Sequence, residues 1–467
     1  MIKRLILVFL LLNSSLLYAN LDTTGRIGYE FGDSWVKVRL KLADSLRAHT
    51  LNSTNIDNST WAQFYTYGQL GPKFDFYAQA SVYTDISNRA FPFHDYQPYN
   101  GIAFNQQGSY ERTWDWISTL SSYTLNDRIK VFAGLEHIKL GTAQRNGVIM
   151  RGNQHNFRPW QDTIRWNHIP APMLQAGFAM NLGFINYEQW NAQPKYHKAL
   201  DRYLHAHRLS AQLPGKIEVG LSEVVIYGST VEAAGSNPNH DTDSLGRTVE
   251  WLYALPFVPY FFAEHYLGDR DNMAMALDLS VKTLPNWEFY GEFFLDDSKT
   301  PLSMLDDSWW GNKWALSAGL NWQRNYTHFS GEWNFEYTRI EPWVYTHHKG
   351  AAYEYTHYGQ SLGGDLGPNA QEVFSQYSLS IPQAKLSISA AQVAKDTAFG
   401  SKISDLHTPE DPLDKKFLHP ASTLRYRELG IEFTLYPTIF LWIGGGIWRY
   451  SGDYQGLRSA GQLGIVW

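Results

Sequence analysis

The feature that most constrains the fold is an alternation of apolar and polar residues that recurs along the chain. The segments 36–42, 74–82, 287–296 and 329–337 each place apolar side chains at every second position. In one of them, Trp287, Phe289 and Phe293 alternate with Glu288 and Glu292. A period of two with one apolar face indicates a half-buried β-strand. A soluble β-sandwich shows the same period, but many such segments with Trp and Tyr at strand ends favour a membrane barrel.

The composition and the last strand also favour a barrel in the outer membrane. Aromatic residues make up 15% of the chain, and after residue 20 no apolar run approaches the ~18 residues that mark a membrane helix. The segment 457–467 alternates strictly and ends on Trp467. An amphipathic last strand with an aromatic end is typical of the signal read by the outer-membrane assembly machinery, although Phe is the usual last residue. We therefore expect that machinery as a partner during biogenesis, and outer-membrane lipid as a lasting one.

The N-terminal residues have the pattern of a secretory signal peptide. Lys3 and Arg4 precede an apolar run from Leu5 to Leu12, and Ala19 follows a short polar break and a second apolar stretch. A basic region, an apolar region of roughly 7–15 residues and a small residue before the cut define such a peptide. An uncleaved membrane anchor is the alternative, but it needs about 20 apolar residues. We expect cleavage after Ala19, which gives a signal peptide at 1–19 and an outer-membrane β-barrel domain at 20–467.

The chain length sets the size of the barrel. Cleavage would leave 467 − 19 = 448 residues. A spanning strand takes roughly 9–11 residues and its connection about 12–15, which allows about 16–20 strands. The sequence therefore predicts an all-β fold, a closed transmembrane antiparallel β-barrel of about 18 strands with short helical insertions. The helices are expected at Gly246–His265 and Pro194–His207, plugging the lumen or on the periplasmic rim, and loops are expected at 51–60 and 402–422.

Charge and cysteine content exclude several classes of function. Without Lys3 and Arg4 the basic residues number 39 − 2 = 37 against 45 acidic ones, a net charge of −8. Such a chain has no basic excess for nucleic acid. The absence of Cys excludes disulfides and thiolate sites, and we expect no cofactor. The acidic pairs Asp296-Asp297 and Asp306-Asp307 do not predict an enzyme, because neighbouring residues in a strand point to opposite faces.

Four stretches, at 134–153, 207–228, 271–297 and 342–369, resemble the Wzi-like capsule assembly proteins. The last is the most specific, with Pro342-Trp343-Val344-Tyr345-Thr346-His347 followed by Tyr355-Thr356-His357-Tyr358-Gly359. The first departs from the family, because Lys139-Leu140-Gly141 lacks an aromatic residue before the glycine and Thr142 replaces a common Pro. The resemblance implies a monomeric barrel of about eighteen strands, closed by loops and a periplasmic helical part. It also implies a lectin-like role that holds capsular or exopolysaccharide at the cell surface.

That role suggests candidate carbohydrate-binding residues. Sugars are bound by aromatic faces and by planar polar side chains that bond hydroxyls. The candidates in and near the most specific stretch are Trp343, Tyr345, His347, Tyr355, His357 and Tyr358, joined by Arg151 and Arg158 as bidentate partners for acidic sugars. Glycine and proline at 363–364 and 367–368 predict that part of this stretch leaves the barrel wall as a loop.

Each of these candidates also has a structural reading. Aromatic girdles are generic to membrane barrels, so the Trp and Tyr residues can serve packing alone. The arginines can form a lumenal ladder balanced by Asp and Glu. His347, His348 and His357 lack a fourth ligand at a recognisable spacing, so no metal site is expected.

Three functions remain open at this point. The first is a polysaccharide-anchoring surface lectin of capsule assembly. The second is a substrate-selective porin of the outer membrane. The third, an outer-membrane hydrolase, has no triad motif to support it.

Overall fold

The computed structural model contains a closed antiparallel β-barrel, which confirms the predicted fold class. It describes residues 20–21, 27–31, 33–50, 55–88, 110–154, 156, 158–159, 171–195, 199–230, 247–300, 303, 305–438 and 440–466. The expected signal peptide and Trp467 lie outside this part of the chain. The eighteen wall strands described are β3 (Ser34–His49), β4 (Asn55–Leu70), β5 (Phe74–Ser87), β6 (Glu111–Asn126), β7 (Ile129–Glu136), β10 (Met173–Asn181), β11 (Ile185–Gln193), β12 (Ala199–Leu213), β13 (Ile217–Thr230), β14 (Asn272–Val281), β15 (Trp287–Asp297), β16 (Lys313–Asn325), β17 (Ser330–Ile340), β20 (Ala370–Ile381), β21 (Ala384–Asp396), β22 (Thr423–Leu435), β23 (Leu441–Gly452) and β24 (Gly456–Val466).

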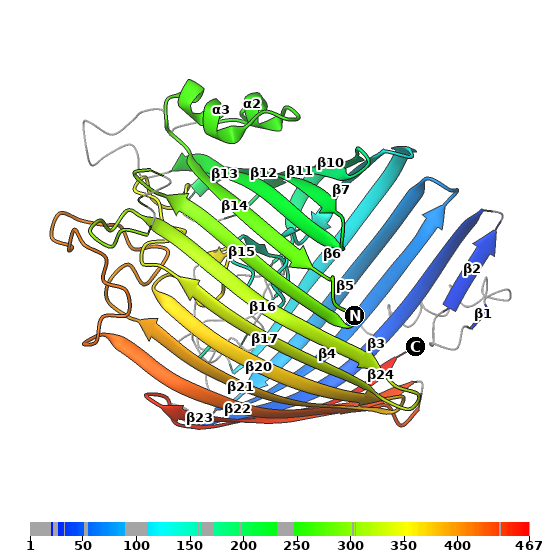
Figure 1. Ribbon diagram of the computed structural model, residues 1–467. Coiled ribbons are helices and arrows are strands. Elements are labelled where there is room, and N and C mark those ends of the chain that lie inside the picture. Colours follow the sequence, from blue (N-terminus) through cyan, green and yellow to red (C-terminus); the bar gives the residue numbers. More distant parts are fainter. Residues whose placement is uncertain are drawn as a thin grey trace.

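The barrel closes between its last and first wall strands. β24 pairs with β3 over a register that runs from Arg458↔His49 to Val466↔Lys41. The short strand β2 (Ile27–Phe31) pairs with the start of β3, and β1 (Asn20–Leu21) pairs with β2 (Figure 1). Because every wall strand has two neighbours, the wall has no open edge, as lipid requires.

Along the wall strands, the alternating apolar and polar side chains face opposite sides of the wall, as the sequence predicts. On β5, Val82 and Ile86 are exposed on the outside, whereas Ser81 and Asp85 are buried on the lumenal side. Leu429, Ile431 and other apolar residues on β22 continue the outer apolar surface. This surface forms the lipid-facing band of the barrel, and the polar alternates line the lumen.

The two ends of the barrel differ in the length of their connections. At one end, called here the short-turn end, β6 joins β7 through 127–128 and β20 joins β21 through 382–383. The other end, called here the long-loop end, carries 341–369 and 397–422. The described ends of the chain lie toward the short-turn side (Figure 1). Short turns are periplasmic and long loops extracellular in such barrels, which orients the molecule.

The predicted helices are confirmed in one place and wrong in the other. Helix α2 (Trp251–Ala254) lies within Gly246–His265, and helix α3 (Tyr260–Leu267) begins within it and ends two residues beyond it. They lie against the outside of the wall at the long-loop end, so the expected placement in the lumen or on the periplasmic rim is wrong (Figure 1). No helix among the described residues is long and apolar enough to cross a membrane.

The prediction of a helix at Pro194–His207 is corrected, because β12 begins at Ala199. Leu204 and Ala206 are buried on the lumenal side, and His205 and His207 are buried on the outer side. A strand that is buried on both faces loses the alternation that identifies it in sequence. The loop expected at 51–60 is wrong from Asn55 onward, where β4 begins, and 51–54 lie outside the described residues, whereas 402–422 is a loop as expected.

Candidate functional site

Two long connections fold inward at the long-loop end and pack against the lumenal face of the wall from β10 to β23. The described residues of 137–159 together with 341–369 are named here the plug. They contain the small strands β8 (Lys139–Leu140), β9 (Met150–Arg151), β18 (Thr356–His357) and β19 (Gln360–Ser361). The Arg151 N–H donates to the Leu362 carbonyl at 2.8 Å and joins the two segments. Val148, Ile149 and Val344 are fully buried within one cluster that also includes wall residues. The segment 341–369 leaves the wall as a loop, as predicted, but it turns into the barrel.

A network of buried charges holds the plug to the wall. The Arg158 guanidinium donates to Asp365 Oδ1 and to Glu372 Oε1 on β20, both at 2.7 Å. Arg145 pairs with the same Glu372 at 3.0 Å. Burial alone would raise the pKa of the Asp365 carboxyl, but Arg158 and Arg151 lower it below its usual range. The arginine ladder balanced by acidic residues is therefore present, and the assignment of Arg151 and Arg158 to sugar binding stays a prediction.

Two lumenal carboxylates bind the backbone of the plug. Glu336 on β17 accepts the N–H groups of Gln144, Arg145 and Asn146 at 2.7–2.9 Å. Glu292 on β15 accepts those of Ala143 and Val148 at 2.6 and 2.8 Å. Carboxylates that accept several buried N–H groups make strong bonds and leave few polar groups unpaired. Neither carboxylate was predicted from the sequence, because each has the pattern of any other polar residue on a lumenal face.

The predicted tyrosines lie inside the plug. Tyr345 and Tyr355 stack with ring centroids 5.5 Å apart, and both contact Phe294 of β15. The Tyr345 hydroxyl donates to the Val148 carbonyl at 2.7 Å, and the Tyr355 hydroxyl donates to the Ile149 carbonyl at 2.9 Å. The exposed fractions of the two residues are 0% and 2%. A direct sugar contact by these rings would require the plug to move, so their binding role stays a prediction.

The predicted histidines and Tyr358 occupy the same segment at different depths. His357 is buried, accepts the Lys195 N–H at its Nδ1 and donates from Nε2 to the Pro172 carbonyl. A neutral imidazole has one accepting and one donating nitrogen, as these two bonds require, and burial lowers the pKa of His357 to about 3. Burial also lowers the pKa of His347, which stacks on His348 and Tyr353, while Tyr358 is half-buried. Their role in sugar binding stays a prediction.

The buried neutral His357 predicts that acid loosens the plug. The unfolded histidine, with a pKa near 6.5, takes up a proton before the folded one does, so stability is lost as pH falls from 6.5 toward 3. Hydrogen exchange at 356–361 is expected to rise over that range. His357→Gln should remove much of this pH dependence, whereas His328→Gln, at an exposed turn, should not. If hydrogen exchange at 356–361 rose equally with acid in the wild type and in His357→Gln, His357 would not be the source of the acid sensitivity.

Trp343 belongs to an aromatic group at the long-loop end, named here the loop aromatic cluster: Trp309, Trp310, Trp343 and His407. Trp310 stacks on His407 with centroids 3.8 Å apart and meets Trp343 edge-on at 5.9 Å. Trp343 is 5% exposed, whereas the other three are half-buried. The members come from the connections 298–312, 341–369 and 397–422. Only Trp343 was predicted; the Trp309-Trp310 doublet in a loop was the available signal for its neighbours.

The loop aromatic cluster combines ring faces with positive charge. The Lys299 ammonium lies 4.8 Å from the centroid of Trp309. Gly400 has φ +51°, and a side chain there would clash with the ring of Trp343 at 2.4 Å. A glycine is therefore required for the ring to seat against the connection 397–422. Aromatic faces beside an ammonium group can stack on a sugar and attract an acidic one.

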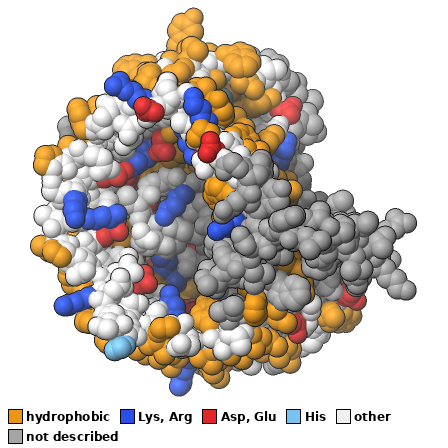
Figure 2. Space-filling model, turned by 90° about the vertical axis from the view of Figure 1, so that its right-hand side faces the viewer, with side chains coloured by type: hydrophobic (Ala, Val, Ile, Leu, Met, Phe, Trp, Pro, Cys, Tyr) orange, Lys and Arg blue, Asp and Glu red, His pale blue; other side chains and the backbone are white. Residues whose placement is uncertain are grey.

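A polar cavity of about 420 Å³ lies at the short-turn end of the lumen. Its lining includes Arg128, Lys130, Glu188, Arg208 and Glu218. Figure 2, which views the molecule from that side, shows Lys, Arg, Asp and Glu side chains within the ring. Among the described residues, the lumen thus has a polar cavity at the short-turn end and the plug at the long-loop end.

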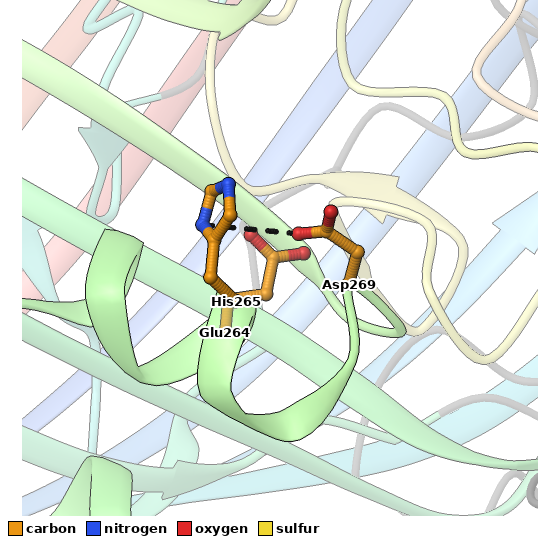
Figure 3. Close-up of side chains that lie close together, drawn as sticks. All are labelled: Glu264, His265 and Asp269. Atoms are coloured by element: carbon orange, nitrogen blue, oxygen red, sulfur yellow. Dashed lines mark ion pairs between the residues drawn. The ribbon is translucent and has the colours of Figure 1, made fainter.

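One group among the described residues has the composition of a metal site: Glu264, His265 and Asp269 at the end of α3 (Figure 3). His265 Nδ1 is 2.7 Å from the Phe261 carbonyl and 3.8 Å from Asp269 Oδ1. The nitrogen that faces the carboxylate therefore already bonds the helix backbone, which argues against a cation there. His347, His348 and His357 form no such group in the part of the chain described.

Comparison with known proteins adds a fold likeness. No family model and no curated protein matches the sequence. A similar solved structure is Wzi, an outer-membrane protein involved in group 1 capsule assembly in Escherichia coli and a carbohydrate-binding β-barrel. It shares 14% identity at a TM-score of 0.55, with 92% of this chain and 84% of that chain covered. The outer-membrane protein opdK from Pseudomonas aeruginosa has 6% identity and a TM-score of 0.48, with 92% and 98% covered. The chain therefore has the fold of outer-membrane β-barrels.

Proposed function

We propose that this chain is an outer-membrane barrel that binds and anchors capsular or exopolysaccharide at the cell surface, without catalysis. The observation that carries the proposal is the plug packed inside the lumen at the long-loop end. A barrel whose extracellular half is occupied by a plug with buried ion pairs is suited to holding a ligand on its outer surface. The fold likeness to a carbohydrate-binding barrel supports the same role.

The loop aromatic cluster is the proposed first contact with the polymer. Its half-buried rings come from three loops of the extracellular end, where a surface polysaccharide meets the protein. Stacking on each ring contributes on the order of 1 kcal/mol, by analogy with other aromatic contacts. Repeated weak contacts along one polymer chain then add through avidity. Under this proposal Tyr345, Tyr355 and His357 support the site from beneath, and Trp343 links them to it.

Replacing Trp309 and Trp310 together by Ala is expected to weaken binding of the strain's purified surface polysaccharide to the detergent-solubilised protein. The loss of two stacking contacts at about 1 kcal/mol each corresponds to roughly thirtyfold. Binding is measured by biolayer interferometry on immobilised polysaccharide. Tyr326→Ala, an exposed aromatic at a short turn of the opposite end, is the matched control. Unchanged affinity in a correctly folded double variant would remove the cluster as the binding site.

A substrate-selective porin is the second candidate function. The polar cavity at the short-turn end, with its charged lining, is the observation that favours it. In a porin the plug would constrict a path for small solutes instead of closing it. Steady conductance of the wild-type protein in planar bilayers would favour the porin, and a silent protein would favour the polysaccharide anchor.

A further inference from the structure

Helices α2 and α3 cover the outside of the barrel wall. The Tyr260 N–H at the start of α3 donates to Glu223 on β13 at 2.7 Å, and Tyr260 packs on His207 of β12 at 4.2 Å. The Glu250 N–H before α2 donates to the Tyr227 hydroxyl at 2.7 Å, and Gln189 of β11 donates to the Tyr253 carbonyl at 3.2 Å. The helices are thus fixed to three neighbouring strands.

The wall beneath the helices is polar on its outer face. Gln189, His205, His207 and Glu223 lie there, at positions where other strands of the barrel present apolar residues. His207 Nε2 and Glu223 Oε2 are 2.8 Å apart, and the exposed fraction of each residue is below 9%. Such groups are costly in contact with lipid unless they are covered and hydrogen-bonded. The two helices supply both the cover and the bonds.

The face that the helices turn away from the wall is apolar and aromatic. Phe262 is 69% exposed and Tyr266 is 84% exposed on α3, and Trp251 is 75% exposed on α2. Leu255 and Phe261 extend the same face, and these five residues are named here the aromatic face. In Figure 2, apolar side chains project outside the ring at the top, where Figure 1 places the helices. An exposed apolar surface of this kind marks an interaction site.

The height of the wall places the aromatic face at membrane depth. On β13 the outer apolar residues Val219 and Leu221 lie between the short turn and Glu223, where the cover of α3 begins. A strand of five residues, tilted by about 40°, rises only roughly 13 Å. The apolar band of such barrels is about 25 Å tall. On this side of the barrel, the helices therefore supply the part of the apolar band that the strand does not.

The aromatic face also continues an established lipid surface. Leu209, Leu221 and Leu277 on β12, β13 and β14 are exposed side by side on the outer wall below the helices. Glu264, His265 and Asp269 gather at the C-terminal end of α3 (Figure 3). These polar groups at one end of α3 would meet the lipid headgroups if the aromatic face lies among the acyl chains.

We propose that α2 and α3 form an outer-leaflet anchor, with the aromatic face among the acyl chains of outer-leaflet lipid and the polar end of α3 at the headgroups. This role is independent of polysaccharide binding and follows from the location of the barrel in the outer membrane. The anchor lets polar side chains sit on the outer wall of a membrane barrel. It also fixes the level of the long-loop end relative to the membrane surface.

Nitroxide labels test the anchor directly, because the native chain has no Cys. Phe262→Cys reports on the aromatic face, Leu221→Cys on the lipid-facing wall, and Leu413→Cys on an exposed loop of the long-loop end. Each labelled protein is placed in vesicles of phosphatidylcholine and lipopolysaccharide. Spin relaxation by oxygen, which partitions into acyl chains, is compared with relaxation by a water-soluble nickel chelate.

The ratio of relaxation by oxygen to relaxation by the nickel chelate is expected to be the same for the labels at residues 262 and 221. For both labels it is expected to exceed the ratio at residue 413 several-fold. A ratio at 262 equal to that at 413 would show an aromatic face in water and overturn the anchor. An immobilised label shielded from both reagents would also overturn it, because a protein partner would then cover the face. All three substitutions are at exposed positions, so the barrel is expected to fold in each.

Discussion

Arg158→Met is expected to release the plug and to convert a silent barrel into one that conducts ions. The Arg158 side chain is buried between Asp365 on the plug and Glu372 on the wall, and removing it takes a guanidinium partner from both buried carboxylates, of which Glu372 keeps Arg145. Breaking a buried pair in this way costs about 3–5 kcal/mol. Movement of 341–369 out of the lumen would return Asp365 to water. Single-channel recording in planar bilayers measures the result.

Two matched variants sharpen the Arg158 experiment. Arg158→Lys keeps the charge but lacks the planar fork that bonds both carboxylates, so its effect is expected to fall between those of the wild type and Arg158→Met. Lys130→Met removes an ion pair with Asp75 whose side chains are 47% and 46% exposed, and such pairs contribute little. A silent Arg158→Met barrel with wild-type resistance to heat would show that the network does not hold the plug.

Glu336→Ala is expected to expose the plug to trypsin at Arg145. The Glu336 carboxylate accepts three consecutive N–H groups around that residue, and each N–H left buried without a partner costs on the order of 1–3 kcal/mol. The segment should therefore open locally while the wall stays folded. Limited trypsin digestion of the detergent-solubilised protein, followed by mass spectrometry, detects cleavage after Arg145.

Glu332→Ala is the control for this digestion, because Glu332 lies on the same lumenal face of β17 near its short-turn end. Its digestion pattern should match that of the wild type. Glu336→Ala protein that resists cleavage after Arg145 as well as the wild type does would contradict the assigned role of Glu336.

The strands of the barrel wall were predictable because their polar–apolar alternation depends only on neighbouring residues in the sequence. Val82 and Ser81 alternate because one faces lipid and the other the lumen, and the same rule holds along β15 and β22. Pro194–His207 was misread because the plug covers one face of β12 and α3 covers the other. Where both faces are buried, the polar–apolar alternation disappears, and sequence alone does not show what covers them.

The plug was not predictable in detail because its contacts join residues far apart in the chain. Arg158 pairs with Asp365, 207 positions away, and Ala143 bonds Glu292 at a separation of 149. The Trp343–Asn369 stretch showed aromatic and glycine residues that leave the wall, but the direction of the turn depends on carboxylates of the lumen. The loop aromatic cluster likewise depends on three loops whose proximity only the closed barrel determines.

The most direct test of the proposed function is the amount of polysaccharide that cells retain. A strain that lacks the gene is complemented with the wild type or with the Trp309→Ala, Trp310→Ala variant, and cell-attached and released polysaccharide are measured separately. The account predicts that deletion shifts polymer from the attached to the released fraction, that the wild type restores attachment, and that the variant restores less. Equal attached fractions in all strains, with the protein present in the outer membrane, would contradict it.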